Sequence, residues 1–340
     1  MDRRRFLLAG TQVLAAGSLW AILGRTAGSG DPVLPGLDEA WAAGGTEGAR
    51  GEVVGAPGAL ATAGGAGMAP RTPLLGVAHG PSPAAITRAA VDALGGMGRF
   101  VSHGARVVVK PNIGWDRTPE QAANTNPEVV AALVKMAFEA GAKSVLVMDN
   151  PCNDPRRCYQ HSGIAEAVKA AGGTVDFFEE SRVRKMKLGG ERLKDWEVHP
   201  AIIEADVRIN CPVAKHHGLS ELTLGMKNWM GSIGGPRGRL HQDIGTSIVD
   251  LAAFFKPQLT VIDGVRILTR GGPQGGSLSD VKRLDTVIAS ADPVAAEVRG
   301  VILAGRKPEE FAYLAKAAGR GLGRTAWPVE EEKLLEVAAG

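Results

Sequence analysis

Residues 105–112 read Ala-Arg-Val-Val-Val-Lys-Pro-Asn, a β-branched run that ends in polar residues. The run from Ala105 to Val109 predicts a strand buried on both faces, because its apolar residues do not alternate with polar ones. A helix is predicted over Pro127–Ala140, with Asn126 as its N-cap. A second buried strand is predicted at Ser144–Met148. This alternation of strand, helix and strand is typical of a parallel sheet covered by helices.

The same alternation continues on both sides of this unit. Further strands are predicted at 74–78, 174–178, 207–211, 259–262 and 286–289, and further helices at 84–94, 162–171, 221–233, 244–255, 294–303 and 308–318. Residues 183–193 are predicted to form a hairpin with a Gly-Gly turn. We therefore predict an α/β domain over residues 73–328. Its sheet is mainly parallel and flanked by helices, and its second half is mixed α/β.

Composition limits the classes of partner. The chain has 340 residues, of which 44% are hydrophobic, so it is long enough to bury a sizeable core. The formal charge of +3 lies entirely in residues 1–27, which carry four arginines and one aspartate. The rest of the chain is formally neutral, and aromatic residues make up only 5% of the sequence. We therefore expect no nucleic-acid partner.

The N-terminal residues 1–27 have the pattern of a targeting segment. Arg3 and Arg4 are followed by one spacer, Phe6 and an uncharged apolar run to about Leu23. This pattern resembles a twin-arginine export signal. It predicts recognition by the twin-arginine translocation machinery and a location outside the cytoplasm, either periplasmic or membrane-tethered. The alternative is an ordinary membrane anchor, although the apolar run is marginal in length for a membrane span.

More than half of residues 26–72 are Gly, Ala or Pro. Such a composition buries too little apolar surface to offset the entropy of ordering the chain. We predict a disordered linker over residues 28–72, which leaves membrane contact to the N-terminal segment alone.

Polar residues follow five of the predicted strands. They are Lys110 with Asn112, Asp149 with Asn150, Lys215 to His217, Asp263, and Asp292. In open α/β sheets, ligands bind beyond the carboxyl ends of the strands, so these side chains are candidates for one binding rim. The alternative for any single member is a turn-forming role.

The segment from Asn210 to His241 is rich in polar residues and glycine. Ser220 is a candidate N-cap for the helix predicted at 221–233, which would place a helix N-terminus beside His217. A small anion could bind at such an N-terminus. Thr223 and Lys227 are four residues apart and would share one face of that helix.

These residue types suggest two kinds of site. Lys110, Lys215 and Lys227 are candidates to hold a carboxylate or phosphate, and the alternative is three solvated lysines. His216 or His217, with His241 and a carboxylate, would suit Zn, Fe or Ni. The sequence contains no serine nucleophile elbow, no Walker A loop and no dinucleotide-binding GxGxxG, so those enzyme classes are not expected.

In order along the chain, these motifs resemble one known family. The residues concerned are Val107 to Asn112, Asn126-Pro127, Asn210 to Lys215 with His217, Thr223, Lys227 to Gly231, His241, Val261 to Gly264, Gly271 to Gly276, and Ser290 to Ala295. The family is called domain of unknown function 362, and the resemblance covers about residues 100–305. It also implies a distant likeness to the architecture of the nickel-pincer lactate racemases, which use His and Lys around an organometallic cofactor.

Some members of that family carry a ferredoxin-type cluster domain. This chain has only Cys152, Cys158 and Cys211 and no dense cysteine run, so no iron–sulfur motif is present. Cys152 and Cys158 lie six residues apart, and both a disulfide and two free thiols are open for this pair. Cys211 is expected to be a buried apolar filler.

Two functional hypotheses follow. The first is an exported, metal- or cofactor-dependent α/β enzyme that acts on a small anionic substrate by proton or electron transfer. Its candidate residues are Lys215, His217 and Lys227 for catalysis, Lys110, Asn112, Asp149, Asn228, Asp263 and Asp292 for binding, and His216, His217 and His241 for a metal ion. The alternative is a non-catalytic periplasmic accessory protein that holds a ligand or metal for a partner.

Overall fold

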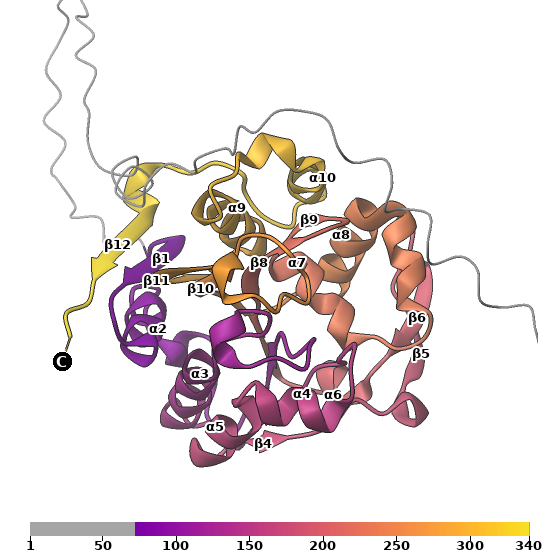
Figure 1. The fold of residues 1–340 in the computed structure, drawn as a ribbon, viewed down its shortest axis with the longest axis horizontal. Helices are drawn as coiled ribbons and strands as arrows, with labels where there is room; N and C mark the ends of the chain where they lie inside the picture. The colour runs from indigo at the N-terminus through magenta and orange to yellow at the C-terminus, as the bar shows by residue number, and fades with distance from the viewer. Residues whose placement is uncertain (1–71, 340) are drawn as a thin grey trace, which may run out of the picture. The chain divides into compact units, whose positions relative to one another are not determined.

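The computed structural model describes residues 72–339, which build a large mixed sheet and a separate two-stranded sheet (Figure 1). The strands of the large sheet are β1 (Leu75–His79), β2 (Arg106–Pro111), β3 (Ser144–Val147), β4 (Thr174–Val175), β7 (Val207–Cys211), β8 (Val213–His217), β9 (Glu221–Thr223), β10 (Leu259–Leu268), β11 (Val281–Ser290) and β12 (Glu332–Glu336). The small sheet pairs β5 (Arg184–Lys187) with β6 (Asp195–Val198).

The helices are α2 (Pro83–Asp92), α3 (Pro127–Glu139), α4 (Pro155–His161), α5 (Ile164–Ala170), α6 (Pro200–Ile203), α7 (Gly225–Asn228), α8 (Ile244–Phe255), α9 (Pro293–Leu303) and α10 (Ala312–Gly319). None of the helices in this part of the chain is both long and apolar enough to cross a bilayer. The predicted export signal at 1–27 and nearly all of the predicted linker at 28–72 lie outside the described residues.

The strand order of the large sheet is β12-β1-β11-β10-β7-β2-β3-β4, with β8 paired to β10 and β9 paired to β8. The five strands from β10 to β4 are parallel to one another, whereas β11 is antiparallel to both of its neighbours. The predicted fold class is therefore confirmed, including its mixed second half. The carboxyl ends of β2, β3 and β7 meet at one edge of this parallel region.

Strand β2 shows why the sheet is covered on both faces. Val107 and Val109 belong to one buried cluster, together with residues of α2, α3 and α5. Val108 belongs to the other cluster, together with residues of α8, α9 and α10. Because successive side chains of a strand point to opposite faces, a run of three valines fills both clusters at once.

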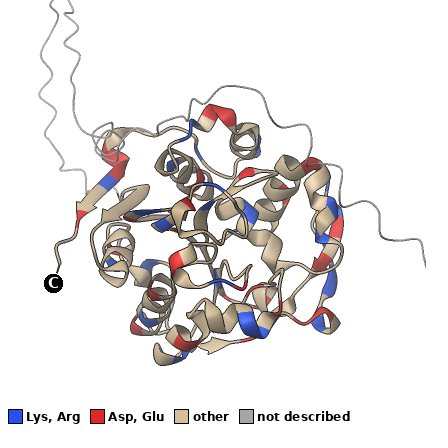
Figure 2. Ribbon diagram, in the orientation of Figure 1, with Lys and Arg blue, Asp and Glu red and all other residues tan. Residues whose placement is uncertain are grey.

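Several element boundaries agree closely with the sequence pattern. Helix α3 begins as predicted, with Asn126 Oδ1 accepting a hydrogen bond of 2.8 Å from Glu128 N. Strand β7 and helix α8 have the predicted bounds. The predicted hairpin is present as β5 and β6, but its second strand begins later than expected. Strand β5 carries only basic charged residues and strand β6 only acidic ones (Figure 2).

The helix predicted at 221–233 is wrong. Residues Glu221–Thr223 form β9, which pairs antiparallel with β8, and only Gly225–Asn228 form a short helix. Glu221 adopts a positive φ of 61°, which breaks a helical path at its start. Ser220 is consequently not an N-cap, and its hydroxyl donates to Leu222 O at 3.0 Å. The expected helix N-terminus beside His217 does not form.

Besides β9, two strands have no counterpart in the prediction. Strand β8 follows β7 after a single proline, and β12 lies beyond the expected domain end at residue 328. Strand β12 pairs in parallel with β1, so residues up to Glu336 complete the edge of the sheet.

Candidate functional site

Lys110 and Asp149 form a buried ion pair at the carboxyl ends of β2 and β3. Lys110 Nζ lies 2.8 Å from Asp149 Oδ1, and the two side chains are 1% and 2% exposed. Asp149 also accepts hydrogen bonds from Ile113 N at 2.6 Å and Asn150 N at 2.9 Å. Burial lowers the pKa of Lys110, and the charge of Asp149 opposes that shift. Asp149 therefore holds and neutralises this lysine.

Asn228 of α7 joins the ends of the neighbouring strands. Its Oδ1 accepts from Lys110 Nζ at 2.9 Å and from Asn112 Nδ2 at 3.1 Å. Its Nδ2 donates to Lys110 O at 3.0 Å and to Asn210 Oδ1 at 2.9 Å. These four hydrogen bonds use the whole amide, so α7 is fixed over the ends of β2 and β7.

Lys215 enters the same network from β8. Its Nζ donates to Asn112 Oδ1 at 2.9 Å and to Ala123 O, and the residue is 2% exposed. Burial lowers its pKa to about 7, and the positive charge of Lys227 adds to this shift. Within residues 72–339, Lys215 forms no salt bridge to a carboxylate.

Among the three buried lysines of the site, Lys227 of α7 has the weakest hydrogen-bond partner for its ammonium group. Only 9% of the residue is exposed, and the hydrogen-bond partner of its Nζ is the thioether sulfur of Met230 at 3.8 Å. Burial lowers its pKa to about 8, the charges of Lys110 and Arg237 lower it further, and Cys152 raises it. A thioether is a weak acceptor, so the ammonium is poorly compensated in this structure.

Two histidines lie beside these lysines. The rings of His217 and His241 stack with centroids 5.7 Å apart and an interplanar angle of 16°. Burial and then the charge of Lys227 lower the pKa of His217 to about 3, and the same two causes lower the pKa of His241. His217 Nδ1 accepts a hydrogen bond from Leu219 N at 3.0 Å, which fixes its ring. Both imidazoles are therefore neutral near pH 7.

The third predicted metal ligand does not join this pair. His216 precedes His217 on β8, so its side chain points to the opposite face of the strand. Its Nδ1 accepts a hydrogen bond from Gly272 N at 3.1 Å. Across residues 72–339, no group of three or more His, Cys, Asp and Glu side chains is placed to hold a metal ion.

This site lies inside the part of the chain that matches a family model. Residues 107–301 match the family described as domain of unknown function (DUF362), which is more than half of the chain. The chain belongs to the DUF362 family. The family resemblance expected from the sequence motifs is thus confirmed.

The DUF362 chain is similar to a thylakoid-associated protein of Synechocystis sp., with 27% identity over 247 residues that cover 70% of this chain and 75% of that protein. Among solved structures it is similar to the lactate racemase apoprotein from Thermoanaerobacterium thermosaccharolyticum. That match has a TM-score of 0.40 and 10% identity, and it covers 66% of this chain and 55% of the racemase chain.

Two carboxylates predicted to bind a ligand have backbone partners in the DUF362 structure. Asp263 accepts hydrogen bonds from Asn126 N at 2.7 Å and Val265 N at 2.9 Å, so it anchors the start of α3 to β10. Burial raises its pKa to about 6. Asp292 caps α9 through the amides of Val294 and its neighbour. The structure thus gives both residues architectural roles.

The sequence reasoning missed two residues at the edge of the lysine group. Arg237 Nη1 donates to Asn150 O at 2.8 Å and its Nη2 donates to Pro151 O at 3.2 Å, which ties its glycine-rich loop to the loop after β3. Cys152 lies in that second loop and is exposed. A negative charge at Cys152 would raise the pKa of each of the three lysines, so its side chain lies within electrostatic range of them. Only the surrounding glycines of Arg237 marked this region in the sequence.

Neither cysteine of the candidate pair is in a disulfide. Cys152 is an exposed free thiol and Cys158 is a buried one. Burial raises the pKa of Cys158 to about 11, so it stays protonated and packs as an apolar side chain. Cys211 is also buried and free, as expected for a filler residue.

Gly231 lies against the ion pair, and we predict that Gly231→Ala destabilises the protein. A Cβ at this position would lie 1.7 Å from Asp149 Oδ1 and 2.7 Å from Lys110 Nζ. The expected loss in the free energy of unfolding is about 1–3 kcal/mol, as for overpacking of a core. Urea unfolding measures it. Gly238→Ala is the matched control, because a Cβ there meets nothing within 4 Å, and equal stability of the two variants would contradict the prediction.

Proposed function

We propose that this protein binds a small carboxylate- or phosphate-bearing molecule beside Lys215, Lys227 and the two stacked histidines, and catalyses proton transfer on it. The observation that carries the proposal is Lys227, a cation with only 9% exposure whose nitrogen has a sulfur atom as its hydrogen-bond partner. A buried charge without a counter-charge is costly, so an anion beside it would be favoured.

The charge balance of the site supports an anionic ligand. Three lysines are almost completely buried, and among the described residues the carboxylate of Asp149 is ion-paired with one of them, Lys110. The positive charge of Lys227 lowers the pKa of Lys215. An anion placed near both ammonium groups would offset their repulsion and their loss of hydration.

The same residues suit proton transfer near neutral pH. A general acid or base works best when its pKa lies near the working pH, and Lys215 and Lys227 have pKa values of about 7 and 8. Neutral His217 and His241 offer imidazole nitrogens beside them. The two rings cannot both become charged easily, because Lys227 opposes the protonation of each.

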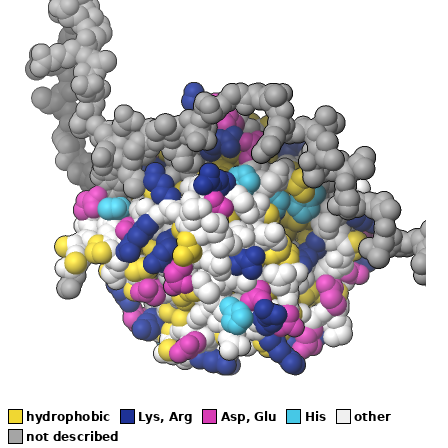
Figure 3. All heavy atoms as spheres, viewed as in Figure 1, with side chains coloured by type: hydrophobic (Ala, Val, Ile, Leu, Met, Phe, Trp, Pro, Cys, Tyr) yellow, Lys and Arg dark blue, Asp and Glu magenta, His cyan; other side chains and the backbone are white. Residues whose placement is uncertain are grey.

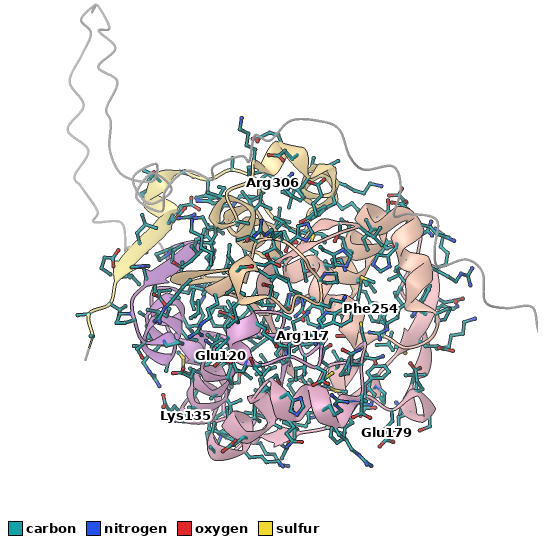
Figure 4. All side chains as sticks on the ribbon, viewed as in Figure 1. Arg117, Glu120, Lys135, Glu179, Phe254 and Arg306 are labelled. Carbon is teal, nitrogen blue, oxygen red and sulfur yellow. The ribbon has the colours of Figure 1, made fainter. Side chains whose placement is uncertain are left out.

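Calorimetric titration with inorganic phosphate, and separately with lactate, tests the binding step. We expect Lys227→Met to weaken binding of these anions by at least about tenfold, because the variant removes a desolvated charge from the site. Lys135→Met is the matched control: Lys135 is exposed on α3, at the periphery of the molecule (Figure 4). Equal affinity of the two variants would contradict the proposal.

A second measurement separates an enzyme from an accessory binding protein. An enzyme that transfers protons at carbon should exchange the C2 hydrogen of lactate for deuterium in D₂O, with the exchange followed by NMR. Binding without exchange for lactate and related 2-hydroxy acids would favour the accessory role over catalysis.

We propose further that the chain is exported by the twin-arginine pathway. Arg3 and Arg4 followed by an apolar run support this proposal, and the similar protein of Synechocystis sp. is thylakoid-associated. Conversion of both residues, Arg3→Lys with Arg4→Lys, should abolish export of the full chain from a bacterium that has this translocase. Cell fractionation measures the exported share. Arg5→Lys is the control, and export of the double variant at its level would contradict the proposal.

A further inference from the structure

Lys227 differs from the other two lysines of the site in what its nitrogen contacts. Lys110 Nζ donates to Pro111 O, to Asn228 Oδ1 and to Asp149 Oδ1, each within 3.0 Å. Three acceptors use all three N–H groups of an ammonium, so Lys110 is held in its charged form. An amine in that setting has no free lone pair and cannot act as a nucleophile.

Lys215 is intermediate between the two. Its Nζ donates to two oxygens, Asn112 Oδ1 and Ala123 O, so one N–H remains for a ligand. Among residues 72–339, the hydrogen-bond partner of Lys227 Nζ is the sulfur of Met230 at 3.8 Å and no oxygen accepts from it. Loss of a proton from Lys227 therefore breaks no strong hydrogen bond, and it removes a buried charge.

From this contrast we infer that Lys227 is an imine-forming nucleophile for a small 2-oxo acid, whose carboxylate lies toward Lys215. The inference rests on the proposed function, since it names the class of anion and the atom that attacks it. The burial of Lys227 and its neighbouring cations favour the neutral amine, as in other lysines that react with carbonyl groups. Its pKa of about 8 leaves a share of reactive amine near neutral pH.

The reaction balances without an oxidant or a reductant. The lone pair of Lys227 Nζ forms a bond to the carbonyl carbon, the C=O π bond breaks, and the oxygen takes a proton to give a carbinolamine. The nitrogen then loses a proton and the hydroxyl oxygen takes a second one. The nitrogen lone pair forms the C=N bond as the remaining C–O bond breaks and one water molecule leaves, and loss of the last N–H proton from the protonated imine gives the neutral imine. The products are the imine and water, and the protonated imine makes the neighbouring C–H bond more acidic. This links the covalent step to the proposed proton transfer.

The site also favours 2-oxo acids over simple aldehydes. Lys215 has one N–H left for a carboxylate, and Asn112, which it contacts, is itself held by Asn228. This donor is thus fixed by the amide network before a ligand arrives, which lowers the entropy cost of binding. A neutral aldehyde of similar size would gain nothing from Lys215.

Reductive trapping tests the inference on the full chain. The protein is incubated with pyruvate and cyanoborohydride, which reduces an imine to a stable secondary amine, and the modified residue is found by peptide mass spectrometry. We expect one adduct on Lys227, at least about tenfold above the yield at exposed Lys135. Propionaldehyde should give a much lower yield at Lys227. Modification spread over exposed lysines, or confined to Lys215, would overturn the inference.

Two further measurements distinguish a failure of the imine inference from a failure of the proposed anion site. Lys227→Arg keeps the charge but removes the nucleophile, so it should bind phosphate and give no adduct. If this variant does not fold, excess phosphate added to the wild-type chain should lower the yield at Lys227 several-fold, and an unchanged yield would overturn the inference. Phosphate binding without any pyruvate adduct rejects the imine and leaves the anion site standing. Absence of both rejects the proposed function as well.

Discussion

Replacement of Asp149 by alanine is expected to lower the free energy of unfolding by about 3–5 kcal/mol, as when one partner of a buried ion pair is removed. The pair is almost inaccessible to water, with exposures of 1% for Lys110 and 2% for Asp149. Without Asp149 the lysine must either keep an uncompensated charge or give up its proton. The amides of Ile113 and Asn150 would lose an acceptor at the same time.

Urea unfolding of three variants separates this effect from a general loss of packing. Asp195→Ala removes an exposed partner of Lys185 and should cost at most about 1 kcal/mol. The double variant Lys110→Met with Asp149→Leu removes both charges, so it should be more stable than Asp149→Ala. An Asp149→Ala variant as stable as Asp195→Ala would show that the pair does not hold the ends of β2 and β3 together.

The sequence pattern predicted an element correctly wherever its apolar residues keep one periodicity, either that of a strand or that of a helix. Apolar β-branched runs predicted β2 and β3, and the N-cap residue Asn126 followed by apolar spacing predicted α3. The pattern failed at 221–233, where apolar residues at helical spacing serve a short strand, one helical turn and a 3-10 turn. Strand β9 pairs with β8 across a short hairpin, and β8 is itself held by the distant strand β10, so sheet formation overrode the helical preference.

The sequence predicted which residues lie at the candidate site, but it did not predict what each of them does there. The rule that ligands bind beyond strand ends pointed to Lys110, Asp149 and Lys215, and the structure brings these together with Lys227. The same rule pointed to Asp263, because a carboxylate that caps a turn and one that meets a ligand look alike in a sequence. Only the hydrogen-bond partners distinguish the two roles.

Surface charge gives no further guide to the site. Lys and Arg side chains lie among Asp and Glu on the viewed face, without one block of a single charge (Figure 3). The charge imbalance arises inside the molecule, where Lys215 and Lys227 are buried without a carboxylate partner in the described chain. This imbalance depends on which lysines are buried, and the composition of the sequence does not show that.

The affinity of the site for sulfate is expected to fall at least about tenfold between about pH 7 and about pH 9. Sulfate keeps the same charge over this range, so the change reports on the protein. Lys215 and Lys227, with pKa values of about 7 and 8, lose their charges in the ligand-free protein over this range. Calorimetry at several pH values measures the effect, and Lys227→Met should bind sulfate weakly with a shallower dependence on pH.

The contribution of these two lysines to the stability of the ligand-free protein should change in the opposite direction. In the unfolded chain a lysine keeps its proton up to about pH 10, whereas these two lysines lose theirs earlier in the folded protein. The unfolded state then binds more protons at these two lysines, so their contribution to stability rises with pH. Asp263 and Glu297, whose pKa values burial raises to about 6 and about 7, act in the opposite sense but only at lower pH.

From about pH 8 to about pH 10 the buried thiols of Cys158 and Cys211 act against the lysines, because burial raises their pKa values and the unfolded chain loses those protons first. The thiols contribute equally to the wild-type protein and to Lys227→Met, so the difference between the two urea midpoints isolates Lys227. We expect the wild-type midpoint to rise relative to that of Lys227→Met over this window, while the sulfate affinity of the wild-type protein falls. A fully solvated Lys227 would leave both quantities unchanged across most of the window. A midpoint difference that stays constant from about pH 8 upward would contradict the burial of an uncompensated lysine at this position.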